Sequence, residues 1–136
     1  MSADLIRQSL ERLAERRGDP TYHVYARLFA GRPDAEALFV GDRSGAARGE
    51  MLAQAFTALL DLAEGGDQGA RLIAIERINH EGLGVPPDVF ADFFPVVAEV
   101  VREGLGEDWT ADVAAAWEAL TDRARALAGS NEAGTH

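Results

Sequence analysis

Residues 72–103 read LIAIERINHEGLGVPPDVFADFFPVVAEVVRE and indicate the class of fold. Apolar side chains recur every three or four positions on both sides of residues 82–87, which are rich in Gly and Pro. That period places them on one face of an α-helix. The stretch therefore predicts a helix that ends near His80, a corner, and a second helix over residues 88–103. A short strand over residues 72–75 is the alternative, but the helical pattern continues on both sides of it.

The same period extends through the rest of the chain. Asp19 and Thr110 stand where helices are expected to begin, and their side chains can accept hydrogen bonds from unpaired backbone amides. Residues 40–46 are rich in turn formers and are expected to form a loop. The further predicted helical segments cover residues 5–17, 20–31, 33–39, 47–64 and 110–127. The prediction is an all-α domain of six to eight helices, packed as a bundle or with orthogonal crossings.

Composition excludes several classes of site. The chain has 136 residues, no Cys, and 13 basic against 23 acidic residues, all the basic ones being Arg. A disulfide framework, a cysteine zinc site and a thiol nucleophile all need Cys, and a Schiff base needs Lys. The length and apolar content predict one domain over residues 1–128, followed by a polar tail over residues 129–136.

Charge and hydropathy bear on partners and location. A formal charge of −10 predicts repulsion from nucleic acid and from anionic membrane surfaces. Charged residues interrupt the apolar stretches, so no membrane span is expected. The amphipathic N-terminal residues do not resemble a secretion signal, and together with the absence of Cys this favours the cytoplasm.

Histidine offers the main chemical possibility. Of the three His residues, His136 is in the tail, His23 lies within a predicted helix and His80 ends one. A lone His cannot build a zinc site, but it can be the axial ligand of a haem. The alternative is that His80 only meets the negative end of its helix dipole.

Three segments in this order resemble the globin family, specifically single-domain bacterial haemoglobins and the globin domain of flavohaemoglobins. The first, residues 25–33, reads YARLFAGRP and is followed by Leu38-Phe39. The second, residues 80–85, reads HEGLGV and is similar to the proximal-histidine motif. The third, residues 105–117, reads LGEDWTADVAAAW and is similar to the start of the last helix of globins. The resemblance implies a globin-like fold around a haem pocket.

The resemblance also assigns roles to residues. It implies that His80 is the proximal ligand of the iron of haem b and that Phe39 packs on the haem face. Tyr25 is expected to point its hydroxyl into the distal pocket, where it can donate to the bound gas. Leu52 and Phe56 are expected to line the distal side.

The distal polar position falls on Arg48, or on Gly49 if the loop before it has a different length. Four Arg residues are candidate partners for the haem propionates: Arg43, Arg48, Arg71 and Arg77.

Two proximal positions depart from the family pattern. Phe90 stands ten residues after His80, where the family has a supporting Tyr, so it is expected to contact the haem without donating a hydrogen bond. Glu76 stands one turn before His80, where the family has an apolar residue. A buried carboxylate is costly unless it is paired, so Glu76 is expected to pair with an Arg or to accept from the imidazole.

The resemblance implies reversible binding of a diatomic gas, O₂, NO or CO. The role would be oxygen storage and transport, or NO dioxygenation with an external reductase. The protein is expected to be a monomer or a homodimer. The alternative is a haem-free globin-fold sensor or lipid-binding signalling module, and Glu76 and the unusual distal position favour it.

Overall fold

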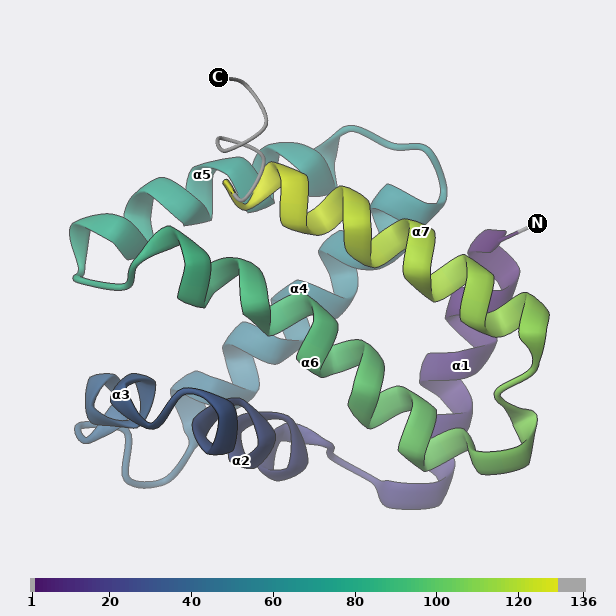
Figure 1. Ribbon diagram of the computed structural model, residues 1–136, viewed down its shortest axis with the longest axis horizontal. Coiled ribbons are helices and arrows are strands. Elements are labelled where there is room, and N and C mark those ends of the chain that lie inside the picture. Colours follow the sequence, from purple (N-terminus) through teal and green to yellow (C-terminus); the bar gives the residue numbers. More distant parts are fainter. Residues whose placement is uncertain (1, 130–136) are drawn as a thin grey trace.

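The computed structural model describes residues 2–129, and in them the chain folds into seven α-helices and two short 3₁₀ helices (Figure 1). The helices are α1 (Ser2–Arg17), α2 (Thr21–Gly31), α3 (Pro33–Glu36), α4 (Ala46–Ala63), α5 (Gln68–Gly82), α6 (Pro87–Leu105) and α7 (Ala111–Leu127), with η1 (Ala37–Phe39) and η2 (Gly106–Asp108). The all-α prediction is confirmed. The alternative of a strand over residues 72–75 is wrong, because α5 runs through them. The predicted tail, apart from Gly129, lies outside the described residues.

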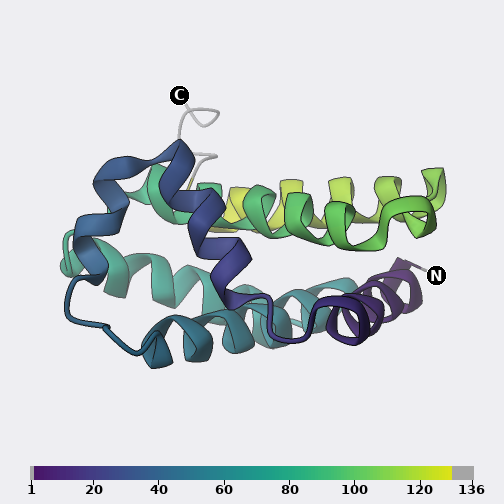
Figure 2. The same cartoon turned by 90° about the horizontal axis from the view of Figure 1, so that it is seen from below.

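The helices lie on two levels. Helices α6 and α7 run side by side on one level, α1 and α4 lie on the other, and α2 crosses from one to the other (Figure 2). Helix α1 packs against both α6 and α7, and α4 packs against α5. The sequence left open a bundle or a packing with orthogonal crossings. The structure has the crossed packing. The crossings leave space between α2, α4, α5 and α6.

Side chains at the helix ends follow the expected signals. The Thr110 hydroxyl accepts from the backbone amide of Val113 at 3.3 Å, as predicted for the start of α7. Asp19 accepts from the amide of Thr21 at 3.0 Å, just before α2. Each bond satisfies an amide that has no partner inside its own helix.

The core lies between the two levels. Its most buried large side chains include Ile6 and Leu13 of α1, Val97 and Val101 of α6, and Trp117 of α7, each at most 1% exposed. They join α1, at the start of the chain, to α6 and α7 near its end, so burial of apolar area holds the two levels together.

Helices α4 and α5 approach closely at Gly69. A Cβ atom there would lie 2.3 Å from the backbone oxygen of Ala58, so only Gly fits. The Gly69 amide donates to the Asp61 carboxylate at 2.6 Å, which satisfies an amide in the first turn of α5. Gly69 therefore fixes the spacing of the two helices.

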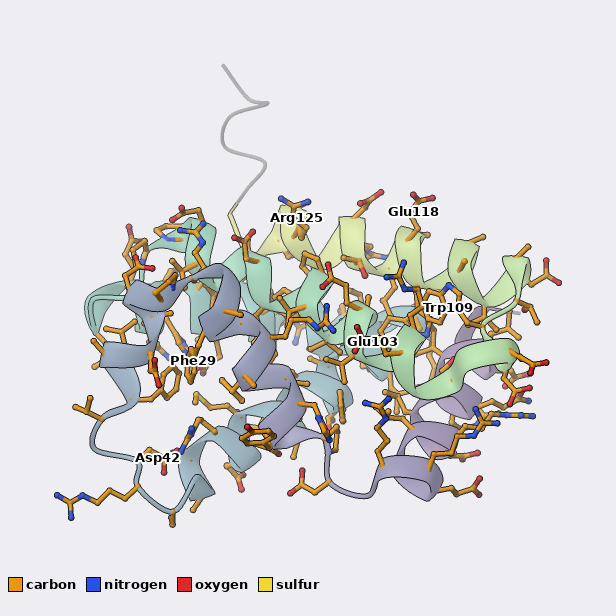
Figure 3. All side chains as sticks on the ribbon, turned by 60° about the horizontal axis from the view of Figure 1, so that its bottom comes forward. Phe29, Asp42, Glu103, Trp109, Glu118 and Arg125 are labelled. Atoms are coloured by element: carbon orange, nitrogen blue, oxygen red, sulfur yellow. The ribbon has the colours of Figure 1, made fainter. Side chains whose placement is uncertain are left out.

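Ion pairs fix α2 across α6. Arg27 pairs with Glu99 at 3.2 Å and with Glu103, which Figure 3 labels on α6. Arg32 pairs with Asp88 at 2.8 Å and with Asp92 at 2.9 Å. These pairs are partly exposed and each contributes little stability alone, but together they set the position of α2 on α6.

None of the helices described is both long enough and apolar enough to cross a membrane.

Candidate functional site

An apolar cavity lies where α2, α4, α5 and α6 meet. The space not filled by atoms, counted out to its open mouth, is about 780 Å³, of which about 100 Å³ is wide enough for water, so the cavity is a narrow slot. The lining residues are Tyr25, Leu28, Ala35, Leu38, Phe39, Met51, Gln54, Ala55, Ala58, Leu72, Ile73, Glu76, His80, Val85, Val89, Phe90, Phe93 and Phe94. Four residues expected at the haem, Tyr25, Phe39, His80 and Phe90, are therefore brought together here.

His80 stands in the last turn of α5, one wall of the slot. Its Nδ1 atom lies 2.7 Å from the backbone carbonyl oxygen of Glu76. A carbonyl oxygen can only accept, so Nδ1 carries the hydrogen and Nε2 holds the lone pair. Nε2 makes no hydrogen bond to any of the described residues, so it is available to a ligand.

The face of His80 is packed by Phe90. The two ring centroids are 4.8 Å apart with the planes at 44°. Phe90 has no polar group, so it restricts the imidazole by contact alone. The packing and the backbone hydrogen bond together limit the orientations that the ring can take.

Glu76 lies one turn before His80 on the same wall. Its Oε1 atom is 3.6 Å from Nδ1 of His80, and its Oε2 atom accepts from the Asn79 side-chain amide at 3.3 Å. The Glu76 side chain is 33% exposed. Glu76 was expected to pair with an Arg or to accept from the imidazole. The structure places its carboxylate beside the imidazole.

Aromatic rings from α2, η1 and α6 form one wall of the slot. The Tyr25 ring centroid lies 5.4 Å from that of Phe39 and 5.6 Å from that of Phe93, both in tilted or edge-on contact. Phe29, labelled in Figure 3, is 5.5 Å from Phe39 and lies behind this wall, outside the slot. Such contacts restrict the rings and give the slot an aromatic wall.

The hydroxyl of Tyr25 is the polar group of this wall. The residue is only 3% exposed, and the hydroxyl makes no hydrogen bond to the described residues. Burial raises the pKa of Tyr25 well above its usual value, although the charge of Arg48 opposes the shift. The phenol therefore keeps its proton and can donate it in a hydrogen bond.

Helix α4 presents a different face to the slot from the one expected. Met51, Ala55 and Ala58 line it, with Gln54 at its mouth. Leu52 and Phe56 do not: Leu52 is buried in the main core and Phe56 packs against that core half-buried. Because successive helical residues point about 100° apart, a shift of one position moves a side chain to another face.

Arg48 does not reach the slot either. Its Nε atom lies 3.0 Å from Asp42 Oδ2, and its Nη2 atom donates to the backbone oxygen of Asp42 at 2.7 Å. Figure 3 labels Asp42 in the loop that leads into α4. Arg48 instead lines a second, more polar hollow, in which about 660 Å³ is wide enough for water. Gly49 lines neither hollow.

Tyr25 is shared by the two hollows, since its side chain lines the second one as well. Tyr25 therefore stands between the slot and the polar hollow that Arg48 lines. Arg43 and Arg71 line neither space, and Arg71 pairs with Asp67 at 2.9 Å.

On α4, the lining residues that the sequence did not predict are Met51, Gln54, Ala55 and Ala58. Their signal was present as the spacing of residues 51, 55 and 58, which share one helical face. The larger apolar residues of a neighbouring face drew the assignment to Leu52 and Phe56. Only the length of the loop before α4 decides between the two faces.

The residues present fit a haem. The slot is lined by apolar and aromatic side chains, by one imidazole with a free lone pair, and by Tyr25, whose phenol can donate a hydrogen bond. The part of the slot that is wide enough for water, about 100 Å³, is smaller than the roughly 300–1,000 Å³ of small-molecule pockets. Leu38 and Gln54 line the slot and are exposed, so they stand where it opens to solvent.

The comparisons with known proteins agree with this geometry. A family model described as Globin matches residues 22–126, which is more than half of the chain and includes every residue of the slot. No curated protein and no solved structure gives a match. On the family match and the arrangement of its helices, the chain belongs to the globin family.

Proposed function

We propose that this globin binds haem b in the slot, with His80 as the axial ligand, and that it reversibly binds a diatomic gas. The observation that carries the proposal is the state of His80. Its Nδ1–H is engaged by a backbone carbonyl, while Nε2 is unengaged on the wall of an apolar cavity. A neutral imidazole held in this way is a ligand for iron.

The other residues of the slot have distinct tasks in this proposal. Phe39 and Phe90 pack against the macrocycle, and the apolar walls exclude water from it. The Tyr25 hydroxyl donates a hydrogen bond to the gas ligand. The haem, when bound, supplies an iron centre that coordinates the gas.

The biological use that we propose is oxygen storage and transport in the cytoplasm. NO dioxygenation is the alternative use, in which the protein would act as an enzyme with electrons from an external reductase. We propose a monomer or a homodimer as the working form. All of these uses share the gas-binding step, so that step is the one to test.

The direct test is reconstitution of the purified protein with hemin. The proposal predicts binding of one haem per chain, a Soret band, and a CO adduct of the ferrous form. Haem binds the folded state, so the melting temperature should rise on reconstitution. A protein that gives no stoichiometric Soret band contradicts the proposal.

A haem-free sensor or lipid-binding module is the second candidate, and two observations favour it. Glu76 places a carboxylate on the wall of the slot, and the slot is narrow. A module of this kind binds an apolar molecule in the slot without a Soret band. In the same reconstitution, stabilisation by a fatty acid but not by hemin would favour it.

A further inference from the structure

Helix α5 carries a short line of polar groups toward the slot. Asn79 donates its side-chain amide to Oε2 of Glu76 at 3.3 Å, and Oε1 of Glu76 faces Nδ1 of His80 at 3.6 Å. The three residues stand within two turns of one helix. The amide therefore holds one carboxylate oxygen while the other is directed at the imidazole.

The carboxylate lies at the one N–H of the imidazole. Nδ1–H already donates to the Glu76 carbonyl oxygen at 2.7 Å, so the side-chain oxygen of the same residue adds a second, longer contact. Phe90 packs on the ring but has no hydrogen-bonding group. Among the described side chains, Glu76 is the one that brings negative charge to Nδ1.

We infer that Glu76 is a positioning residue that makes His80 a more strongly donating ligand and so favours ferric over ferrous iron. The inference rests on the proposed function. Negative charge at Nδ1 gives the imidazole imidazolate character, which strengthens the bond made by Nε2. A stronger donor stabilises the iron state of higher positive charge more than the lower one.

Asn79 helps to position the Glu76 carboxylate. A carboxylate on a flexible side chain loses conformational freedom when it is held beside a partner, and the amide bond reduces the number of positions it can take. Removal of Asn79 should therefore weaken the effect of Glu76 without abolishing it.

The test uses the reconstituted full chain and four variants. Glu76→Gln keeps the size and removes the charge, and Glu76→Asp keeps the charge but shortens its reach. Asn79→Ala removes the holding amide. Glu81→Gln is the matched control, because Glu81 is an exposed carboxylate that directly follows His80 and does not line the slot. Circular dichroism establishes that each variant is folded.

Two readouts separate an effect through His80 from a general loss of charge. Glu76→Gln should lower the iron–histidine stretching frequency in the ferrous resonance Raman spectrum and raise the reduction potential. Glu76→Asp and Asn79→Ala should shift both in the same direction by less, and Glu81→Gln should leave the stretch unchanged.

The possible results distinguish a failure of the inference about Glu76 from a failure of the proposed haem binding. A normal Soret band with an unshifted iron–histidine stretch in Glu76→Gln overturns the inference alone. A shift of the iron–histidine stretch in Glu81→Gln as large as that in Glu76→Gln also overturns the inference. The shift would then come from the loss of any nearby charge and not from contact with His80. A wild-type protein that binds no hemin overturns the proposed function, and the inference with it.

Discussion

Asp42 holds Arg48 through three hydrogen bonds. The Asp42 carboxylate accepts from the backbone amide and from Nε of Arg48, both at 3.0 Å, and the Asp42 carbonyl oxygen accepts from Nη2 at 2.7 Å. The same carboxylate accepts from the amide of Ala47 at 3.1 Å. These contacts fix the start of α4 and keep Arg48 in the second hollow, away from the slot.

Tyr25→Phe should speed dissociation of O₂ roughly tenfold or more, which corresponds to about 1.4 kcal/mol. The variant loses the phenol donor, and nothing else on that wall replaces it. The fold should change in stability by only about 1 kcal/mol or less, because the hydroxyl has no hydrogen bond to the described residues. Stopped-flow measurement of O₂ release from the reconstituted protein gives the rate.

Two controls accompany the Tyr25 variant. Tyr22→Phe alters an exposed Tyr on the same helix, 78% exposed, and should leave the rate unchanged. Arg48→Ala should alter gas association more than dissociation, since Arg48 borders the hollow behind Tyr25. A large rise in the O₂ off-rate of Arg48→Ala, beside no change in Tyr25→Phe, would make Arg48 the distal donor.

Acid should destabilise the fold through three Asp residues whose pKa values are lowered. Burial raises the pKa of Asp42, but hydrogen bonds from the amides of Arg48 and Ala47 and from the Arg48 side chain outweigh it. Hydrogen bonds from Arg32 and Arg16 lower the pKa values of Asp88 and Asp108 respectively.

A carboxyl whose folded-state pKa is lowered stabilises the fold at any pH above its unfolded value, which is about 3.9. That contribution is lost as the pH falls through the lower folded-state pKa. The melting temperature should therefore be insensitive to these groups from pH 7 to 5 and fall below about pH 4. Asp42→Asn should melt lower at pH 7 and show a smaller fall in acid. An acid-insensitive melting temperature down to pH 2 would show that these pairs do not stabilise the fold.

Gly69→Ala should destabilise the protein by about 1–3 kcal/mol, the range for overpacking. The added Cβ meets the Ala58 backbone at 2.3 Å, and backbone cannot rotate away as a side chain can. Gly31→Ala is the control, since nothing lies within 4 Å of a Cβ there. It should be neutral or slightly stabilising. Urea unfolding measures both, and equal stabilities would mean that α4 and α5 are not in close contact.

The helices could be predicted because local chemistry sets them. Thr110 caps α7 as expected, and the long apolar repeat at residues 88–103 lies inside α6. The predicted end of this helix differs slightly from the observed one: α6 continues through Gly104 and Leu105, two residues beyond the predicted end at residue 103. A Gly weakens a helix but does not end it when its neighbours are buried.

The proximal wall of the site could also be predicted, whereas the α4 wall could not. His80 and Phe90 flank one fixed corner, so their mutual position follows from short-range geometry. The rotation of α4 depends on the loop at residues 40–45, whose path is set by Asp42 and by Gly45 with φ of +80°. The spacing of apolar residues fits more than one face of α4, so it does not decide which face meets the slot.

The proposed binding of the iron by His80 is tested by the variant His80→Ala. Reconstitution with hemin, followed by absorption spectra of the ferric, ferrous and CO forms, should show that the variant has lost the wild-type Soret band while keeping its helical content. Added imidazole should restore the spectrum by occupying the space that the side chain leaves. His23→Ala, which alters an exposed His outside the slot, should behave as the wild type does. An alanine variant that keeps stoichiometric haem and the wild-type spectra without imidazole would contradict the claim.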